Sequence, residues 1–187
     1  LANSEIFINL MEKVADIPVL GIVLGTVMTL IVQSSSATIA VLQNFASQAG
    51  PTGASIIGLT GAIPILLGDN IGTTITALIA SIGQSKNAKR TAIAHSIFNI
   101  SGSIVFVCII PWFAKFIQFI SPKGNEIDVI SRQIANAHTT FNIVCTLIWL
   151  PLIPLMVKIV KFLVRGDDPR KKQKASFLDD KIIGQAV

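Results

Sequence analysis

The sequence predicts an all-α polytopic membrane protein that contains a re-entrant hairpin and broken helices. Hydrophobic residues make up 51% of the 187 residues and charged residues only 13%, whereas a soluble domain usually carries about 25% charged residues. Between Asp16 and Lys86 the only ionisable side chain is that of Asp69. A soluble fold of that length would expose more charges to water, so the lipid bilayer is the expected surrounding medium.

The first element expected is an interfacial amphipathic helix over residues 1–16, in which apolar and polar side chains alternate at helical spacing. Residues 17–50 follow without a charge, and as one helix they would be about 51 Å long, against a hydrocarbon core of about 30 Å. The polar run Gln33-Ser34-Ser35-Ser36 interrupts this stretch, and serine favours helix N-caps. We therefore predict half-helices over 18–32 and from Ser35 or Ser36 onward, which form a re-entrant hairpin.

The region 53–84 repeats the design and predicts a broken helix. An apolar run up to residue 67 is followed by the polar interruption 68–74, with sequence GDNIGTT, and by a second apolar run. Irregular backbone at membrane depth is tolerated only where it is buried in protein or lines a cavity. Two consecutive breaks therefore indicate a transport site within a repeat that covers residues 17–84.

Two transmembrane spans are expected in residues 85–164, at about 91–120 and 133–164, with Pro111, Pro151 and Pro154 as kinks. The basic residues lie in clusters at the ends of these spans, and the loop 121–132 between the spans is neutral. The positive-inside rule places both clusters, and the linker 165–187, on the cytoplasmic side. The net charge of +5 therefore indicates topology and no nucleic-acid partner.

The two spans carry an internal repeat with the pattern A-H-x-x-F-N-I, at residues 94–100 and 137–143. A histidine and an asparagine at i and i+4 share one helix face with the phenylalanine. The two helices are thus expected to offer similar faces to a common neighbour. Their side chains are expected to contact the ligand-binding residues and not the ligand itself, chiefly by interhelical hydrogen bonds. These supporting residues are His95, Asn99, His138 and Asn142.

The serine run offers chemistry for an anion. The N–H groups at the start of a half-helix carry the positive end of its dipole, and hydroxyls donate further hydrogen bonds, which suits phosphate with its several acceptor oxygens. The alternative is that the hydroxyls bond to backbone carbonyls and only fold the hairpin. The candidate phosphate ligands are Gln33, Ser34, Ser35 and Ser36.

The second interruption offers oxygen ligands for a hard cation such as sodium, from carboxylate, amide and hydroxyl groups. A lone carboxylate in apolar sequence is a functional candidate by default. Close helix packing is the alternative for Gly68 and Gly72. The candidate sodium ligands are Asp69, Asn70, Thr73 and Thr74, with sodium as the only metal and no cofactor.

An intramembrane serine hydrolase is the alternative of another class, since the serines, a histidine and Asp69 supply its residue types. The sequence contains no G-x-S-x-G elbow, and three adjacent serines suit multidentate binding better than one activated nucleophile. We therefore expect no enzyme activity.

The runs QSSSAT at 33–38 and GDNIGTT at 68–74, with the two A-H-x-x-F-N stretches, resemble the bacterial sodium/phosphate cotransporter family, relatives of the animal type II sodium-phosphate cotransporters. The resemblance covers about residues 16–160. It implies a sodium-coupled phosphate symporter of the bacterial plasma membrane, built from inverted repeats whose QSSS hairpins share one central site. The residue before N-I-G-T-T is usually small in the family, whereas here it is Asp69.

The chain resembles the second of the family's two repeats, with its trailing spans. It would need a complementary repeat from an N-terminal half or from another protomer to complete the site. Residues 165–187 are similar to the linker that leads to a PhoU-like cytoplasmic domain in many members. The residues alone leave open other small oxyanions in place of phosphate, and protons in place of sodium.

Overall fold

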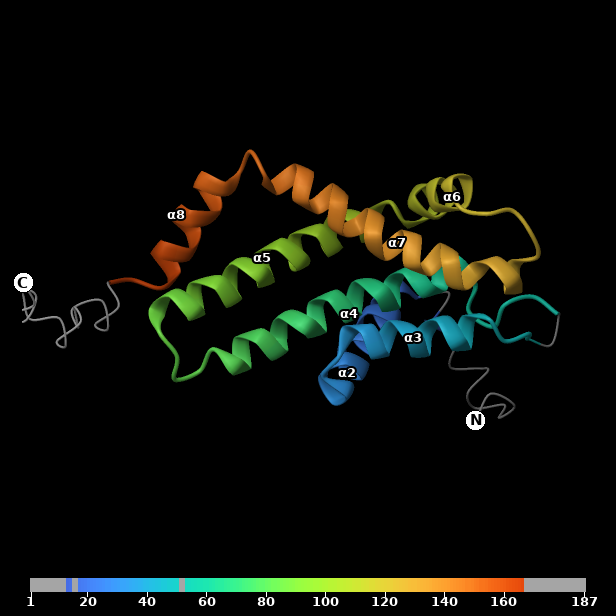
Figure 1. Cartoon of the computed structure of the whole chain (residues 1–187), viewed down its shortest axis with the longest axis horizontal. Coiled ribbons are helices and arrows are strands. Elements are labelled where there is room, and N and C mark those ends of the chain that lie inside the picture. The colour runs from blue at the N-terminus through green and yellow to red at the C-terminus, as the bar shows by residue number, and fades with distance from the viewer. Residues whose placement is uncertain (1–12, 15–16, 51–52, 167–187) are drawn as a thin grey trace, which may run out of the picture.

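The computed structural model describes residues 13–14, 17–50 and 53–166. This part of the chain is all helical apart from turns and one isolated bridge between Ala49 and Ser55, as the sequence predicts. Nearly all of the predicted interfacial helix 1–16 and linker 165–187 lies outside the described residues. The helices in chain order are α2 (Pro18–Val32), α3 (Ser35–Ala46), α4 (Gly58–Ala80), α5 (Lys86–Cys108), α6 (Ile110–Ile120), α7 (Glu126–Trp149) and α8 (Ile153–Leu163) (Figure 1).

The predicted hairpin is confirmed in α2 and α3. Helix α2 ends at Gln33, which has the left-handed backbone conformation (φ 55°, ψ 25°), and Ser34 is extended. Helix α3 then begins at Ser35, with Ser34 as its N-cap: the Ser34 hydroxyl oxygen accepts a hydrogen bond from the N–H of Ala37. The half-helices and the position of the break agree with the sequence prediction.

The predicted broken helix over 53–84 is wrong, because α4 runs without interruption through residues 68–74. Its polar side chains bond to their own helix: Thr73 donates to the carbonyl of Asp69, and Thr74 donates to that of Ile71. The helix can therefore continue where the sequence shows a polar run. Its 23 residues are long and apolar enough to cross a membrane.

Each of the two predicted spans consists of two helices. Helix α5 alone is long and apolar enough to cross a membrane, and the chain breaks at Ile109 before α6, which has Pro111 in its first turn. Helix α7 starts earlier than predicted, at Glu126, and the chain bends by 86° between α7 and α8. Pro151 lies in this bend and Pro154 lies in the first turn of α8, so the prolines lie at the breaks, as predicted.

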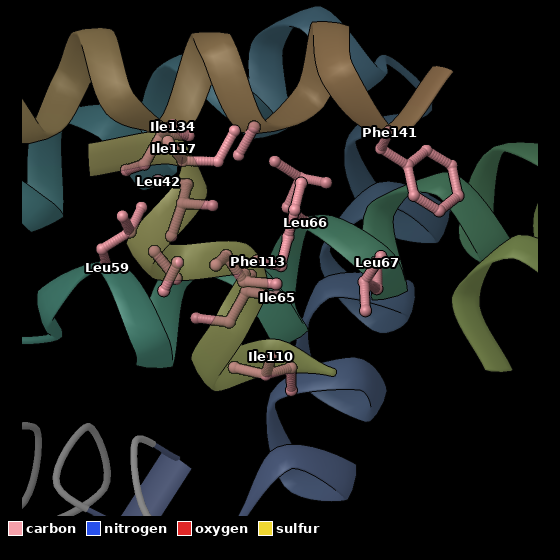
Figure 2. Close-up of a cluster of buried hydrophobic side chains, with 14 of the residues drawn as sticks. Leu42, Leu59, Ile65, Leu66, Leu67, Ile110, Phe113, Ile117, Ile134 and Phe141 are labelled. Carbon is pink, nitrogen blue, oxygen red and sulfur yellow. The ribbon is translucent and has the colours of Figure 1, made fainter. Parts of the chain in front are cut away.

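Helix α4 is the centre of the molecule. Figure 1 shows it in the middle of the view, between α7 above and α3 below, and residues 61–70 are all buried. Apolar side chains from α3, α4, α6 and α7 meet in one core, which Figure 2 shows in close-up. The core holds the polar middle of α4 in a fixed position against its neighbours. The labelled core residues are Leu42, Leu59, Ile65, Leu66, Leu67, Ile110, Phe113, Ile117, Ile134 and Phe141.

Candidate functional site

Glycines bring α2 and α4 into close contact. A Cβ atom on Gly25 would overlap the backbone carbonyl of Ile65, and one on Gly68 would overlap that of Ile22. A Cβ on Gly72 would lie 2.8 Å from the Cβ of Thr29. The alternative that Gly68 and Gly72 serve close helix packing is therefore confirmed. The close approach places the polar side chains of α2 beside those of α4.

Asp69 is buried where these helices cross, and it contacts Thr29 of α2. The side chain of Asp69 is 0% exposed, and its Oδ1 lies 2.6 Å from the Thr29 hydroxyl. That hydroxyl also lies 2.9 Å from the carbonyl of Gly25, although it has one hydrogen to donate. The Asp69 Oδ2 is buried without a hydrogen-bond partner among the described residues. A carboxyl group in this setting needs a cation or a proton beside it.

Asn70 links the same turn of α4 to α7. Its Oδ1 lies 3.2 Å from Nε2 of His138, and its Nδ2 is buried with no hydrogen-bond partner in the described part of the chain. The Nδ2 of Asn142 in turn donates to the backbone carbonyl of His138. The second copy of the internal repeat therefore lies beside the candidate cation ligands, and its supporting role stays a prediction.

Thr73 and Thr74 follow Asp69 by about one turn on the same helix. Their hydroxyls donate to carbonyls of α4 at 2.9 and 2.8 Å. A hydroxyl that donates its hydrogen still has lone pairs with which to accept or to coordinate a cation. Thr74 is fully buried and Thr73 is half-buried, so the predicted sodium ligands lie on one continuous helix and not at a helix break.

The serine residues occupy the tip of the hairpin. Ser34 and Ser36 are exposed and Ser35 is half-buried. Ser34 caps α3, whereas the hydroxyls of Ser35 and Ser36 and their backbone N–H groups have no hydrogen-bond partner among the described residues. No hydroxyl of the serine run donates to a backbone carbonyl among the described residues, and Ser34 takes part in folding the hairpin as the acceptor of the cap. The other two leave donors free at the positive end of α3.

Gln33 has a backbone conformation that favours glycine. It is the one non-glycine residue with positive φ in the described ranges, and the left-handed conformation costs a residue with a Cβ about 1–2 kcal/mol. Glycine is the usual choice after a helix end of this kind. The role of the Gln33 side-chain amide as a phosphate ligand stays a prediction.

The tip and the buried carboxylate are joined by one turn of α2. The N–H of Gln33 donates to the carbonyl of Thr29 at 2.7 Å, and Thr29 is the residue that contacts Asp69. One turn of helix is about 5.4 Å. Thr29 therefore contacts both the buried carboxyl group of Asp69 and the residue at which α2 ends.

The two copies of the internal repeat differ in their surroundings. Both contact α4 through their helices, and in both the asparagine donates to the backbone carbonyl of the histidine, at 3.2 Å for Asn99 and 2.9 Å for Asn142. His95 makes no side-chain hydrogen bond to the described residues. It lines two cavities beside the first half of α5. Neither His95 nor Asn99 makes a side-chain hydrogen bond to Asp69 or Asn70 in the described part of the chain.

Sequence reasoning missed Thr29. The buried face of α2 consists of Gly21, Gly25 and Thr29, which recur every four residues and therefore share one side of the helix. This stripe of small residues was available as a signal for a helix contact. The partner carboxylate 40 positions further along the chain was not.

Several known proteins are similar in sequence to this chain. The sequence profile of the Na+/Pi-cotransporter family matches residues 2–147. The chain is 37% identical over 102 residues to the uncharacterized protein YqeW of Bacillus subtilis, a match that covers 54% of this chain and 31% of that protein. It is 41% identical over 92 residues to the human sodium-dependent phosphate transport protein 2B, covering 46% of this chain and 12% of that protein.

The rabbit sodium-dependent phosphate transport protein 2A is 38% identical over 91 residues, a match that covers 46% of this chain and 13% of that protein. The chain thus spans less than a third of the length of these relatives, and no solved structure matches it. The family and the relatives 2A and 2B are transporters, not enzymes. In the described structure neither histidine hydrogen-bonds to a serine at the hairpin tip. The chain belongs to the Na+/Pi-cotransporter family.

Proposed function

We propose that this chain forms half of the transport unit of a sodium-coupled inorganic phosphate symporter, which crosses the bacterial plasma membrane several times. The observation that carries the proposal is the hairpin tip, where the hydroxyls and backbone N–H groups of Ser35 and Ser36 have no partner among the described residues. A tetrahedral oxyanion accepts several hydrogen bonds at once. The tip supplies such donors with no acidic side chain in the serine run.

Phosphate is held at the tip by three kinds of group. The backbone N–H groups of Ser35 and Ser36 donate along the helix dipole, and the hydroxyls of the serine run donate beside them. Ser34 takes part through its hydroxyl hydrogen, since its oxygen is the acceptor in the cap. The amide of Gln33 adds a donor from the end of α2.

Sodium is held by the oxygens of α4 and α2. The Asp69 carboxylate supplies the charge, and the oxygens of Thr29, Asn70, Thr73 and Thr74 supply neutral ligands within about a turn of it. Because α2 connects Thr29 to Gln33 by one turn, cation binding at Asp69 favours one position of the tip. This connection is the proposed basis of coupling.

A complementary repeat completes the site. It comes from another part of the same protein or from another protomer and approaches the tip of the hairpin, where Gln33, Ser34 and Ser36 are exposed. Inverted repeats that meet near the middle of the bilayer are the common design of secondary transporters. The second tip would then supply donors to the opposite side of the anion.

Replacement of each tip serine by alanine tests the phosphate site. The loss of a hydrogen bond to a charged group costs about 1.5–3 kcal/mol, so Ser35→Ala and Ser36→Ala are expected to weaken apparent phosphate affinity about ten- to a hundredfold. Ser34→Ala also removes the cap of α3, which costs about 1 kcal/mol of stability. The measurement is phosphate uptake at several concentrations in vesicles that contain the full-length transporter.

Ser47→Ala is the matched control for these variants. Ser47 is the C-cap of α3, so the same substitution is made on the same helix, about three turns from the tip. Surface expression is measured for each variant. Near-normal phosphate affinity in all three tip variants would remove the serines from the site and leave them as residues that fold the hairpin.

A further inference from the structure

A patch of basic side chains lies outside the proposed transport site, where the end of α8 meets the start of α5. Arg90 of α5 donates from Nη2 to the backbone carbonyls of Val164 and Gly166, at 2.9 and 2.7 Å. These bonds hold the end of α8 against the start of α5 and join the two basic clusters into one patch. The described part of this patch contains no Asp or Glu. Its cations are Lys86, Lys89, Arg90, Lys158, Lys161 and Arg165.

Helix α8 carries exposed basic side chains next to exposed large apolar ones. The bend of 86° turns it across the direction of α7, as Figure 1 shows at the orange end of the chain. Helix α8 then runs back along α5, because Ile153 and Met156 line one cavity with Ala94 and Phe98, and the carbonyl of Val164 accepts from Arg90. Lys158 and Lys161 are exposed, and so are Leu155 (47%) and Phe162 (66%). Basic residues combined with large apolar ones are typical of helices at the lipid headgroups.

An open apolar cavity lies inside the angle between α8, α7 and α5. Its volume is about 380 Å³, which is in the range of ligand-binding pockets. It is lined mainly by apolar side chains, among them Ala94 and Phe98 of α5, Trp149 of α7, and Ile153 and Met156 of α8. The basic patch lies on the same two helices, α5 and α8, so a ligand that fits both has an anionic head and an apolar tail.

We propose that this elbow binds an anionic phospholipid, with one acyl chain in the cavity and the headgroup on the cations of α8 and α5. The positive-inside rule assigns the lipid to the cytoplasmic leaflet, whose surface is negative and attracts Lys and Arg. Phosphatidylcholine has the same tails but no net charge, so the patch selects against it. The lipid fills the angle between α7 and α8 and stabilises the bend.

Quenching of Trp149 fluorescence by brominated lipid tests the proposal. The full-length transporter is purified in detergent, and phosphatidylglycerol with dibrominated acyl chains is compared with phosphatidylcholine that carries the same chains. Subtraction of the Trp149→Phe variant isolates the Trp149 signal. We expect phosphatidylglycerol to quench this signal at a concentration at least about tenfold lower than phosphatidylcholine. The double variant Lys158→Gln/Lys161→Gln should raise the required concentration about 25-fold, or about fivefold for each lysine.

Two further variants control this experiment. Lys115→Gln removes an exposed lysine from α6, outside the patch, and should leave quenching unchanged. Ala94→Leu narrows the cavity and should reduce quenching by both lipids, and phosphate uptake shows that each variant is folded. Equal quenching by the two lipids would contradict charge selection. Relief of quenching by millimolar inorganic phosphate would instead assign the patch to free anions. Absence of quenching by either lipid would show that protein covers the cavity. Each of these two results would overturn the proposal.

Discussion

The hairpin tip at residues 33–36 and the middle of α4 at residues 68–74 look alike in sequence but fold differently. Both are short polar runs inside long apolar stretches. At the tip the helix ends and a new one begins, whereas α4 continues through its polar run as one helix. A polar run in apolar sequence therefore indicates a site for chemistry, but it does not by itself indicate a break in the backbone.

The difference follows from where each side chain finds its partner. Threonines can donate to carbonyls of their own helix, as Thr73 and Thr74 do, and glycines let α4 pack directly on α2. At the tip, Ser34 offers a cap to the next helix and Gln33 adopts the left-handed conformation that ends the previous one. The hairpin thus exposes backbone N–H groups, while α4 keeps its backbone satisfied and buries a carboxylate.

The largest loss of stability is expected from larger side chains at the glycines where α2 contacts α4. Gly25→Leu and Gly68→Leu would each drive a side chain into the backbone of the facing helix. Overpacking usually costs about 1–3 kcal/mol, and a clash with backbone belongs at or above the upper end. We expect loss of folded transporter, measured as thermal stability in detergent and as surface expression.

Gly50→Ala is the matched control, because a Cβ there would make ordinary contacts of 3.5 Å and longer. It should change the thermal stability little. If Gly68→Leu were as stable as Gly50→Ala, the close packing of α2 on α4 would be wrong, and α4 would be free to break at residues 68–74.

A smaller effect is expected at the histidines of the internal repeat, where the two copies differ. His138→Ala would leave the buried side chain of Asn70 without its hydrogen bond, which costs about 1–3 kcal/mol. His95→Ala removes no side-chain hydrogen bond to the described residues and should cost less than about 1 kcal/mol. Thermal unfolding of the two variants in the full-length transporter measures the difference. Equal losses would show that the two copies have the same role.

The smallest change in the free energy of unfolding is expected at Gln33, where the substitution should stabilise the protein and not destabilise it. Gln33→Gly relieves the left-handed conformation and should stabilise the protein by about 1 kcal/mol, while apparent phosphate affinity falls because the side-chain amide is lost. Gln33→Asn is the matched variant, because asparagine tolerates this conformation and keeps an amide. If Gln33→Gly left phosphate affinity unchanged, the glutamine would not contribute to the anion site.

The sequence predicted the hairpin well because its signals are local. An uncharged stretch too long for one span, interrupted by serines, requires a break, and the serine run marks the position to within a residue. The prolines likewise marked both later breaks. The size of the bend after α7 was not predictable, because a proline shows that a helix stops and does not show the direction in which the chain continues.

The candidate site was predicted in part. Asp69 stood out because it is isolated in apolar sequence, and Asn70 was included because its amide oxygen is a ligand for a hard cation. The contacts of these residues with Thr29 and His138 depend on how α2 and α7 cross α4. Those crossings join residues 40 and 68 positions apart, and periodicity within one helix contains no information about them. The same limit explains why His95 and His138 looked equivalent.

The most direct test of the account is whether phosphate and sodium dependence separate between the two regions. Uptake by the full-length transporter in vesicles is measured against phosphate at saturating sodium, and against sodium at saturating phosphate, for Ser36→Ala and Asp69→Asn. We expect Ser36→Ala to raise the half-saturating phosphate concentration about ten- to a hundredfold and to leave the sodium curve within about twofold. Asp69→Asn should shift the sodium curve and leave the phosphate curve nearly unchanged. An unchanged sodium curve for Asp69→Asn, or equal shifts of both curves in both variants, would contradict the division of the site into an anion-binding tip and a cation-binding α4.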